Sequence, residues 1–128
     1  MRKILIITAL MATICSCSNT NKEYCSACED ELTRIYLDLS FAYEHREEIY
    51  QKLVFQELDF EEFDKLNWLY CKYNSEIEVL EKDMKHYEME IKKYSKKWEI
   101  NKWTRISYTR LDSVKNAIYG YQPALHNN

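Results

Sequence analysis

The strongest constraint on this chain is an apolar seam in its second half, where ten side chains recur at steps of only three or four residues. The seam consists of Leu66, Tyr70, Tyr73, Ile77, Leu80, Met84, Tyr87, Ile91, Tyr94 and Trp98. This spacing puts all of them on one face of an α-helix, whereas a half-buried strand needs alternation at every second residue. The 128-residue chain also contains only one Gly and one Pro. Because the turns of sheets are rich in these residues, the sequence predicts an all-α fold.

A second seam of the same period occupies the first half of the chain. It consists of Leu32, Ile35, Leu39, Ala42, Arg46, Ile49 and Leu53. Arg46 is its one polar member, and Tyr36, Tyr43 and Tyr50 repeat beside it at heptad spacing. These tyrosines widen the apolar stripe to the breadth typical of a helix in a bundle. We expect them to lie in the core, with their hydroxyl groups at its edge.

The two seams are out of register with each other, and the slip falls at residues 57–63. Asp59 can cap a new helix there, and Glu62 completes a pattern that resembles a capping box. We therefore predict a long antiparallel helical hairpin or coiled coil, with helices over about 27–57 and 60–100. A kinked continuous helix is the alternative, because no Gly or Pro marks the turn.

The distribution of charge favours the hairpin. Residues 23–64 carry thirteen acidic and three basic side chains, a net charge of −10, whereas residues 65–115 carry eight acidic and twelve basic side chains, a net charge of +4. Antiparallel packing within one chain places these opposite charges beside each other. An antiparallel homo-oligomer would do the same, so the pattern leaves the oligomeric state open.

A further apolar set follows the second seam and is out of phase with it. It consists of Trp103, Ile106, Leu111, Val114 and Ile118. Asn101 or Thr104 can cap a third helix over about 103–119, which would fold back and leave 120–128 as a tail. We prefer this three-helix bundle to a longer second helix, so the helical domain is predicted to span 27–119.

The N-terminus has the layout of an export signal. Two cations precede an apolar run over residues 4–14, which is shorter than the roughly 20 residues that a membrane span needs. The segment Ile14-Cys15-Ser16-Cys17 resembles the lipobox of bacterial lipoproteins. The resemblance implies removal of a signal peptide over residues 1–16 and lipidation of Cys17. Ordinary cleavage without a lipid is the alternative.

The same resemblance implies a location. Ser18 after the modified Cys resembles the signal for sorting to the outer membrane more than the one for inner-membrane retention. We therefore expect an exported protein, lipid-anchored to the bacterial cell envelope, which faces either the periplasm or the outside. Residues 17–26 would form the lipidated Cys and a polar tether.

Cys25 and Cys28 form a Cys-x-x-Cys pair. An oxidising exported environment favours a local disulfide between them, and intermolecular bridges, a metal site or redox function are the alternatives. A metal site would need two further ligands, and the sequence offers no second pair. Cys71 is predicted to be a buried free thiol, because a turn near residue 58 places it far along the hairpin from the other two.

The sequence contains no arrangement of residues typical of catalysis and predicts neither an enzyme nor a cofactor. Without residues 1–16 the chain has 16 basic and 21 acidic side chains, which argues against nucleic-acid binding and gives no polybasic patch for anionic lipid. Trp68 and Tyr108 lie off the seams and are candidates for binding a protein partner. The predicted function is protein binding, as an adaptor or an immunity- or exclusion-type lipoprotein. A structural spacer and a redox protein using Cys25 and Cys28 are the alternatives.

Overall fold

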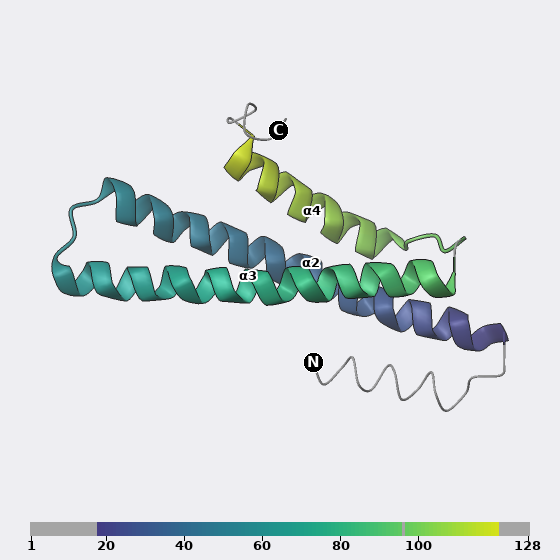
Figure 1. Ribbon diagram of the computed structural model, residues 1–128. Helices are drawn as coiled ribbons and strands as arrows, with labels where there is room; N and C mark the ends of the chain where they lie inside the picture. The colour runs from purple at the N-terminus through teal and green to yellow at the C-terminus, as the bar shows by residue number, and fades with distance from the viewer. Residues whose placement is uncertain (1–17, 96, 121–128) are drawn as a thin grey trace.

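Three helices make up the fold in the computed structural model, which describes residues 18–95 and 97–120 (Figure 1). They are α2 (Ser18–Phe55), α3 (Phe60–Tyr94) and α4 (Lys102–Tyr119). α2 and α3 form an antiparallel hairpin, and α4 folds back and packs against α2 (Figure 1). The described residues contain no strand, so the all-α prediction and the preferred third helix are both confirmed.

The hairpin turns between Phe55 and Phe60, where the sequence predicts it. Arg46 donates a hydrogen bond from Nη1 to Asn74 Oδ1 at 2.9 Å, which joins α2 nine residues before its end to α3 fourteen residues after its start. Asp59 is the N-cap of α3 and its side chain accepts from the backbone N–H of Glu62 at 2.8 Å, so the predicted cap is confirmed. The turn therefore needs neither Gly nor Pro, because a side-chain cap satisfies the first free amides of the new helix.

The core follows both seams. Each of the ten residues of the seam from Leu66 to Trp98 is buried or half-buried, and Leu32, Ile35, Leu39 and Ala42 of the other seam are almost inaccessible. The hydroxyl of Tyr36 donates to Glu88 on α3 at 2.9 Å, and the hydroxyl of Tyr43 donates to Glu81. The predicted position of the tyrosine hydroxyls, at the edge of the core, is thus confirmed for these two residues.

The core is thickest beside the middle of α2, where α4 covers it, and thin near the α2–α3 turn. α4 has 18 residues and rises about 27 Å, whereas α2 has 38 and rises about 57 Å. α4 therefore covers only part of α2. Near the turn, where two helices lack a third, Tyr50 is exposed although its heptad partners Tyr36 and Tyr43 are buried.

α2 begins at Ser18, so the prediction of a tether up to residue 26 is wrong over the described residues. The helix continues because its early side chains reach the end of α3. The ring of Tyr24 lies edge-on to that of Tyr94, with centroids 5.0 Å apart, and Cys25 is fully buried. Tertiary packing of this kind stabilises helical turns that local propensity would leave frayed.

α3 ends at Tyr94 rather than near residue 100, yet Trp98 still packs against the core. Glu29 of α2 holds the connecting loop. Its buried carboxylate accepts hydrogen bonds from Trp98 Nε1 at 2.7 Å and from the backbone N–H of Asn101. Asn101 is in turn the N-cap of α4, since its side chain accepts from the N–H of Thr104 at 3.0 Å. The last seam residue therefore belongs to a loop.

The apolar set predicted for the third helix is only partly correct. Leu111 is buried and Val114 and Ile118 are half-buried, but Trp103 and Ile106 are exposed. The first half of α4 meets α2 through small polar residues instead. Thr104 is fully buried, and its Oγ1 lies 2.8 Å from Oγ1 of Thr33. Small side chains let the two backbones approach closely, and the large apolar residues of α4 then point away.

Candidate functional site

The predicted disulfide between Cys25 and Cys28 is not formed, and both residues are free, buried thiols. Both lie within the unbroken helix α2, where each sulfur is packed in the interface with α3. The Sγ of Cys25 lies 4.0 Å from the carbonyl oxygen of Ile91. Burial raises the pKa of Cys28 to about 12 and also raises that of Cys25. Thiols of this kind stay protonated and are poor nucleophiles, which weighs against the redox alternative.

Cys71 is free, as predicted, but it is exposed rather than buried. It lies between the seam residues Tyr70 and Tyr73 and therefore on the outer face of α3. The predicted lipidation site Cys17, the signal peptide 1–16 and residues 121–128 of the tail lie outside the described residues.

The two predicted partner-binding residues are not brought together. Trp68 is 63% exposed on α3, where Nζ of Lys72 lies 5.6 Å from the centroid of its ring. Tyr108 is exposed on α4, but its ring packs edge-on against Tyr36 at a centroid distance of 5.3 Å. Trp68 thus remains a candidate for binding a partner, whereas Tyr108 also serves to attach α4 to α2.

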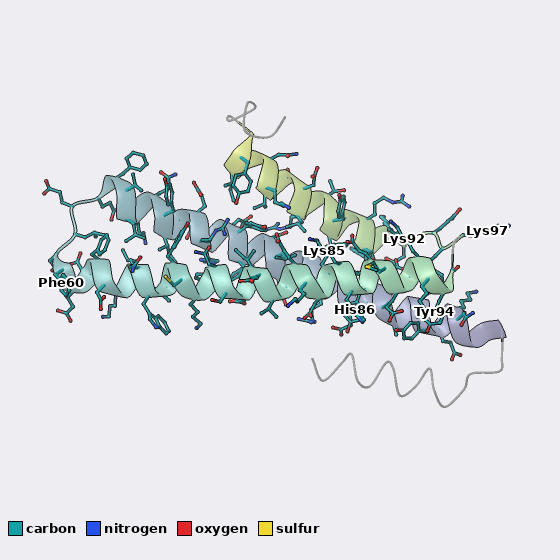
Figure 2. All side chains as sticks on the ribbon, viewed as in Figure 1. Phe60, Lys85, His86, Lys92, Tyr94 and Lys97 are labelled. Atoms are coloured by element: carbon teal, nitrogen blue, oxygen red, sulfur yellow. The ribbon has the colours of Figure 1, made fainter. Side chains whose placement is uncertain are left out.

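A group of exposed apolar residues lies at the α2–α3 turn, and we call it the aromatic tip. It comprises Val54, Phe55, Phe60 and Phe63. Phe60 is 85% exposed and Phe55 is 75% exposed, and Figure 2 shows Phe60 at the extreme end of the hairpin. Trp68 follows about two turns further along α3. The sequence already indicates this group, because three phenylalanines lie in or beside the predicted turn and outside the continuous part of either seam.

The aromatic tip is surrounded by exposed acidic residues. They are Glu57, Asp59, Glu61, Glu62 and Asp64. Large aromatic side chains with a charged surround resemble the anatomy of protein interfaces, where aromatic residues are enriched at the centre and polar groups at the rim. Isolated exposed apolar residues are common on protein surfaces, but a cluster at one end of a rod needs an explanation.

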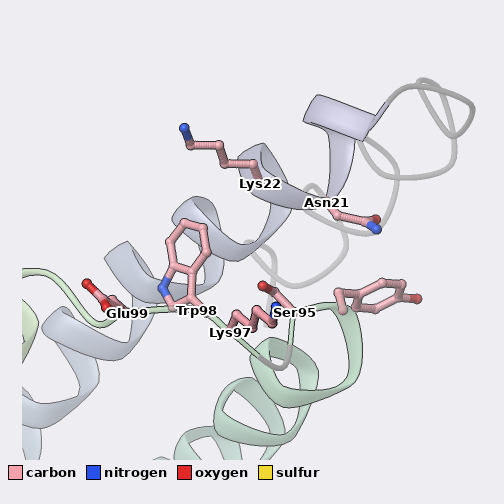
Figure 3. A pocket seen from close by; sticks show the side chains of 7 residues that line it. Asn21, Lys22, Ser95, Lys97, Trp98 and Glu99 are labelled. Carbon is pink, nitrogen blue, oxygen red and sulfur yellow. The ribbon is translucent and has the colours of Figure 1, made fainter.

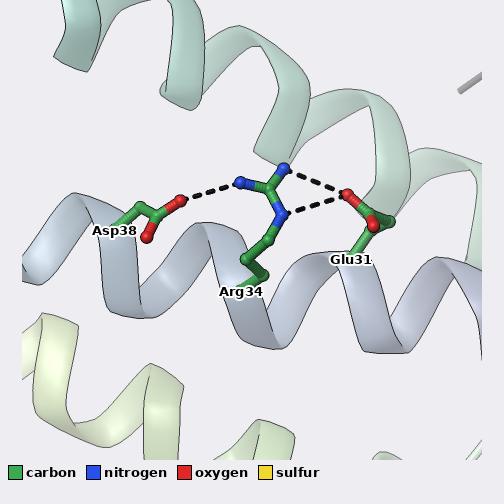
Figure 4. Close-up of polar contacts among 3 residues, drawn as sticks. All are labelled: Glu31, Arg34 and Asp38. Carbon is green, nitrogen blue, oxygen red and sulfur yellow. Dashed lines mark hydrogen bonds and ion pairs between the residues drawn. The ribbon is translucent and has the colours of Figure 1, made fainter. Parts of the chain in front are cut away.

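Other polar features of the described residues have structural explanations. On α2, Arg34 binds Glu31 at 3.0 Å and Asp38 at 2.8 Å, and these helical ion pairs support the helix to which all three belong (Figure 4). Arg46 joins all three helices, because its Nη2 donates to the hydroxyl of Tyr119 on α4 at 2.6 Å. Neither arrangement is a pair of catalytic carboxylates.

The described residues contain no set of three or more His, Cys, Asp and Glu side chains that could hold a metal ion. Among the same residues, no helix is long and apolar enough to cross a membrane. A hollow of about 530 Å³ lies between the first turns of α2 and the loop after α3 (Figure 3). Lys22 and Lys97 are among the residues that line it.

No model of a protein family, no curated protein and no solved structure matches this chain.

Proposed function

We propose that this chain is an exported, lipid-anchored protein of the bacterial outer membrane that acts without catalysis, by binding another protein. It would serve as an adaptor or as an immunity- or exclusion-type lipoprotein. The observation that carries the proposal is the aromatic tip, whose phenylalanines are exposed at the end of a rod.

The position of the tip relative to the anchor supports this function. α2 begins one residue after Cys17 and ends at Phe55, within the tip. A helix of this length would hold the tip up to about 55 Å from a lipid attached at Cys17. Anchoring at one end and exposed aromatics at the other is a sensible arrangement for a protein that meets its partner away from the membrane surface.

The chemistry of the tip limits the class of partner. Burial of two phenylalanine side chains on binding would contribute several kcal/mol, since each contributes about 1.5–3 kcal/mol when it leaves water. The acidic surround favours a partner whose apolar pocket is bordered by Lys or Arg and disfavours one with an acidic border. Self-association through the tips would bring the two acidic surrounds together, so a second copy of this chain is disfavoured.

Site-specific photocrosslinking in native membranes tests the proposal. A photoreactive phenylalanine analogue at position 60 should give one discrete protein adduct. The same analogue at position 89 is the matched control, because Met89 is 69% exposed on the same helix and lies outside the tip. Adducts of equal yield from both positions, or no adduct from position 60, would refute binding through the tip.

A structural spacer is the second candidate, and the length of the hairpin supports it. The two functions respond oppositely to two changes. Replacement of Phe55 and Phe60 by Ser would abolish an adaptor but leave a spacer working, and stability should change little because both side chains are exposed. Removal of one heptad from each of α2 and α3 would shorten a spacer while keeping the tip intact.

The redox alternative predicts that a Cys25→Ser/Cys28→Ser variant loses activity. The burial of both thiols and their raised pKa values make this candidate the weakest of the three. Retained function in a folded double variant would eliminate it.

A further inference from the structure

A second distinctive surface lies at the other end of the bundle, around the loop between α3 and α4. We call it the basic base. Its cations are Lys22, Lys92, Lys93, Lys97, Lys102 and Arg105, and all six are exposed. Between residues 92 and 105 the sequence contains a single acidic residue, Glu99. Figure 2 shows Lys92 and Lys97 at the end of the hairpin opposite Phe60.

Exposed apolar side chains are interleaved with these cations. Trp103 is 70% exposed, and Ile100 and Ile106 are also exposed. Trp103 and Ile106 are three residues apart on α4 and therefore share a face of that helix. Trp beside Lys and Arg is the combination favoured at the boundary between a membrane and water, where the ring sits at headgroup level and the cations meet lipid phosphates.

The basic base lies where the chain would be attached to the membrane. Asn21 and Lys22 in the first turns of α2 line the hollow of about 530 Å³ together with Lys97 and Trp98 in the loop (Figure 3). Ser18, the first residue of α2, directly follows the predicted lipidation site. A lipid on Cys17 would therefore hold this end of the bundle, and not the aromatic tip, against the membrane.

The fold fixes the shape of this surface and removes a negative charge from it. Glu29 is almost completely buried beneath the loop, where it accepts hydrogen bonds from Trp98 Nε1 and from the N–H of Asn101. The cations are therefore presented outward, and the exposed carboxylates next to them are Glu99 in the loop and Glu23 beside Lys22. Such pre-organisation reduces the entropic cost of binding a surface.

From this arrangement we propose that the basic base docks on an anionic phospholipid surface, with Trp103 at headgroup level. The inference rests on the proposed anchoring at Cys17 and adds an orientation to it. The same negative surface potential that attracts the base repels the acidic residues around the aromatic tip. Trp103 precedes Thr104, which meets Thr33 roughly 22 Å along α2 from Ser18, so docking would incline the rod, with the basic base on the membrane and the aromatic tip away from it.

Fluorescence quenching by lipid tests the docking directly. The full lipidated protein is reconstituted into vesicles whose lipids carry bromine close to the headgroup, made either of phosphatidylcholine or of phosphatidylcholine with phosphatidylglycerol. We expect stronger quenching with phosphatidylglycerol, and loss of the larger part of it in Trp103→Phe. Trp68→Phe is the matched control, because Trp68 is similarly exposed but lies near the other end, and it should keep the quenching.

Neutralising the cations provides a second readout. The variant Lys92→Gln/Lys93→Gln/Lys97→Gln should lower the equilibrium constant for docking on phosphatidylglycerol vesicles by on the order of 100-fold. High salt should lower the same constant in part, because it screens the charges. All three side chains are exposed, so folding should be unaffected, which far-UV circular dichroism checks. Quenching of Trp103 that is absent, or is equal in both kinds of vesicle, would overturn the docking.

Flotation of the same vesicles separates this proposal from the lipid anchor. Flotation with pure phosphatidylcholine depends on the anchor alone. If the protein floats there but Trp103 stays unquenched on phosphatidylglycerol vesicles, docking is refuted and the anchor is left intact. Flotation only with phosphatidylglycerol refutes the anchor and supports the basic base. A protein that floats with neither refutes both.

Discussion

Replacing Glu29 by Gln should loosen the loop and helix α4 from the rest of the bundle. The carboxylate is almost completely buried and accepts two hydrogen bonds, from Trp98 Nε1 at 2.7 Å and from the N–H of Asn101. Gln has nearly the same shape, so the substitution leaves no cavity. The side-chain carbonyl oxygen of Gln can accept one of the two hydrogen bonds. The side-chain NH2 group of Gln is itself a donor, so the second N–H group loses its acceptor.

The expected loss follows from these contacts. A hydrogen bond to a charged acceptor contributes about 1.5–3 kcal/mol, and the variant loses one such bond and the charge that strengthens the other. Because Trp98 is only half-buried and Asn101 is exposed, water can partly satisfy the orphaned donor. We therefore expect a loss of about 2 kcal/mol in the free energy of unfolding, out of the roughly 5–15 kcal/mol typical of a domain.

Urea unfolding followed by far-UV circular dichroism measures this loss, and hydrogen exchange locates it, with faster exchange expected first in residues 101–107. Glu23→Gln is the control, because Glu23 is an exposed glutamate in the same helix and its change should fall within about 0.5 kcal/mol. A double-mutant cycle of Glu29→Gln with Trp98→Phe should show a coupling of about 1 kcal/mol or more. Additive effects of the two substitutions would refute the assigned role of Glu29.

Three further predictions follow from the thiols and the helix cap. Among the cysteines that the structure describes, only Cys71 should react quickly with a thiol reagent in the native protein, whereas Cys25 and Cys28 should react on unfolding, and equal rates for these three would contradict the burial of Cys25 and Cys28. Burial raises the pKa of Cys28 from 9.0 to about 12 and that of Tyr87 from 10.0 to about 12. The unfolded chain thus loses these protons first, so stability should be fully present below about pH 9 and fall between about pH 9 and 12. A pH series of urea titrations checks this, and constant stability across that range would count against it. Asp59→Ala should cost about 1 kcal/mol by removing the N-cap of α3, which urea unfolding would detect, and an unchanged midpoint would mean that the cap contributes little.

Much of the fold could be predicted from the spacing of apolar residues alone. A step of three or four residues keeps side chains on one helical face whatever surrounds the helix, so the seam that ends at Trp98 is buried or half-buried throughout. The position of the turn followed from the change of register at residues 57–63, and Asp59 gave the start of α3. With the turn fixed, the antiparallel pairing of the two helices follows, but counting from residue 58 places Arg46 opposite Tyr70, whereas its observed partner is Asn74.

The candidate site was less predictable, because exposure depends on which neighbour covers a face. Trp103 and Ile106 are as apolar as Leu111, yet they are exposed because Thr104 and Ser107 form the close contact with α2. Periodicity identifies the residues that share a face but does not say which of two adjacent faces is covered. For the same reason the exposure of Trp68 was a reasonable expectation, whereas the packing of Tyr108 against Tyr36 was not foreseen.

The sequence by itself therefore determined the number of helices in the described residues, the hairpin and its caps, but not where α2 begins or α3 ends, since periodicity and caps depend on local geometry and the outer ends on tertiary packing. The tertiary structure decided the two ends. It left Phe55 and Phe60 exposed because α4 is too short to reach them, and it gathered cations from α2, α3 and α4 into one surface. A net charge or an apolar pattern is a sum along the chain, whereas a binding surface depends on which residues distant in sequence become neighbours, and only packing specifies that.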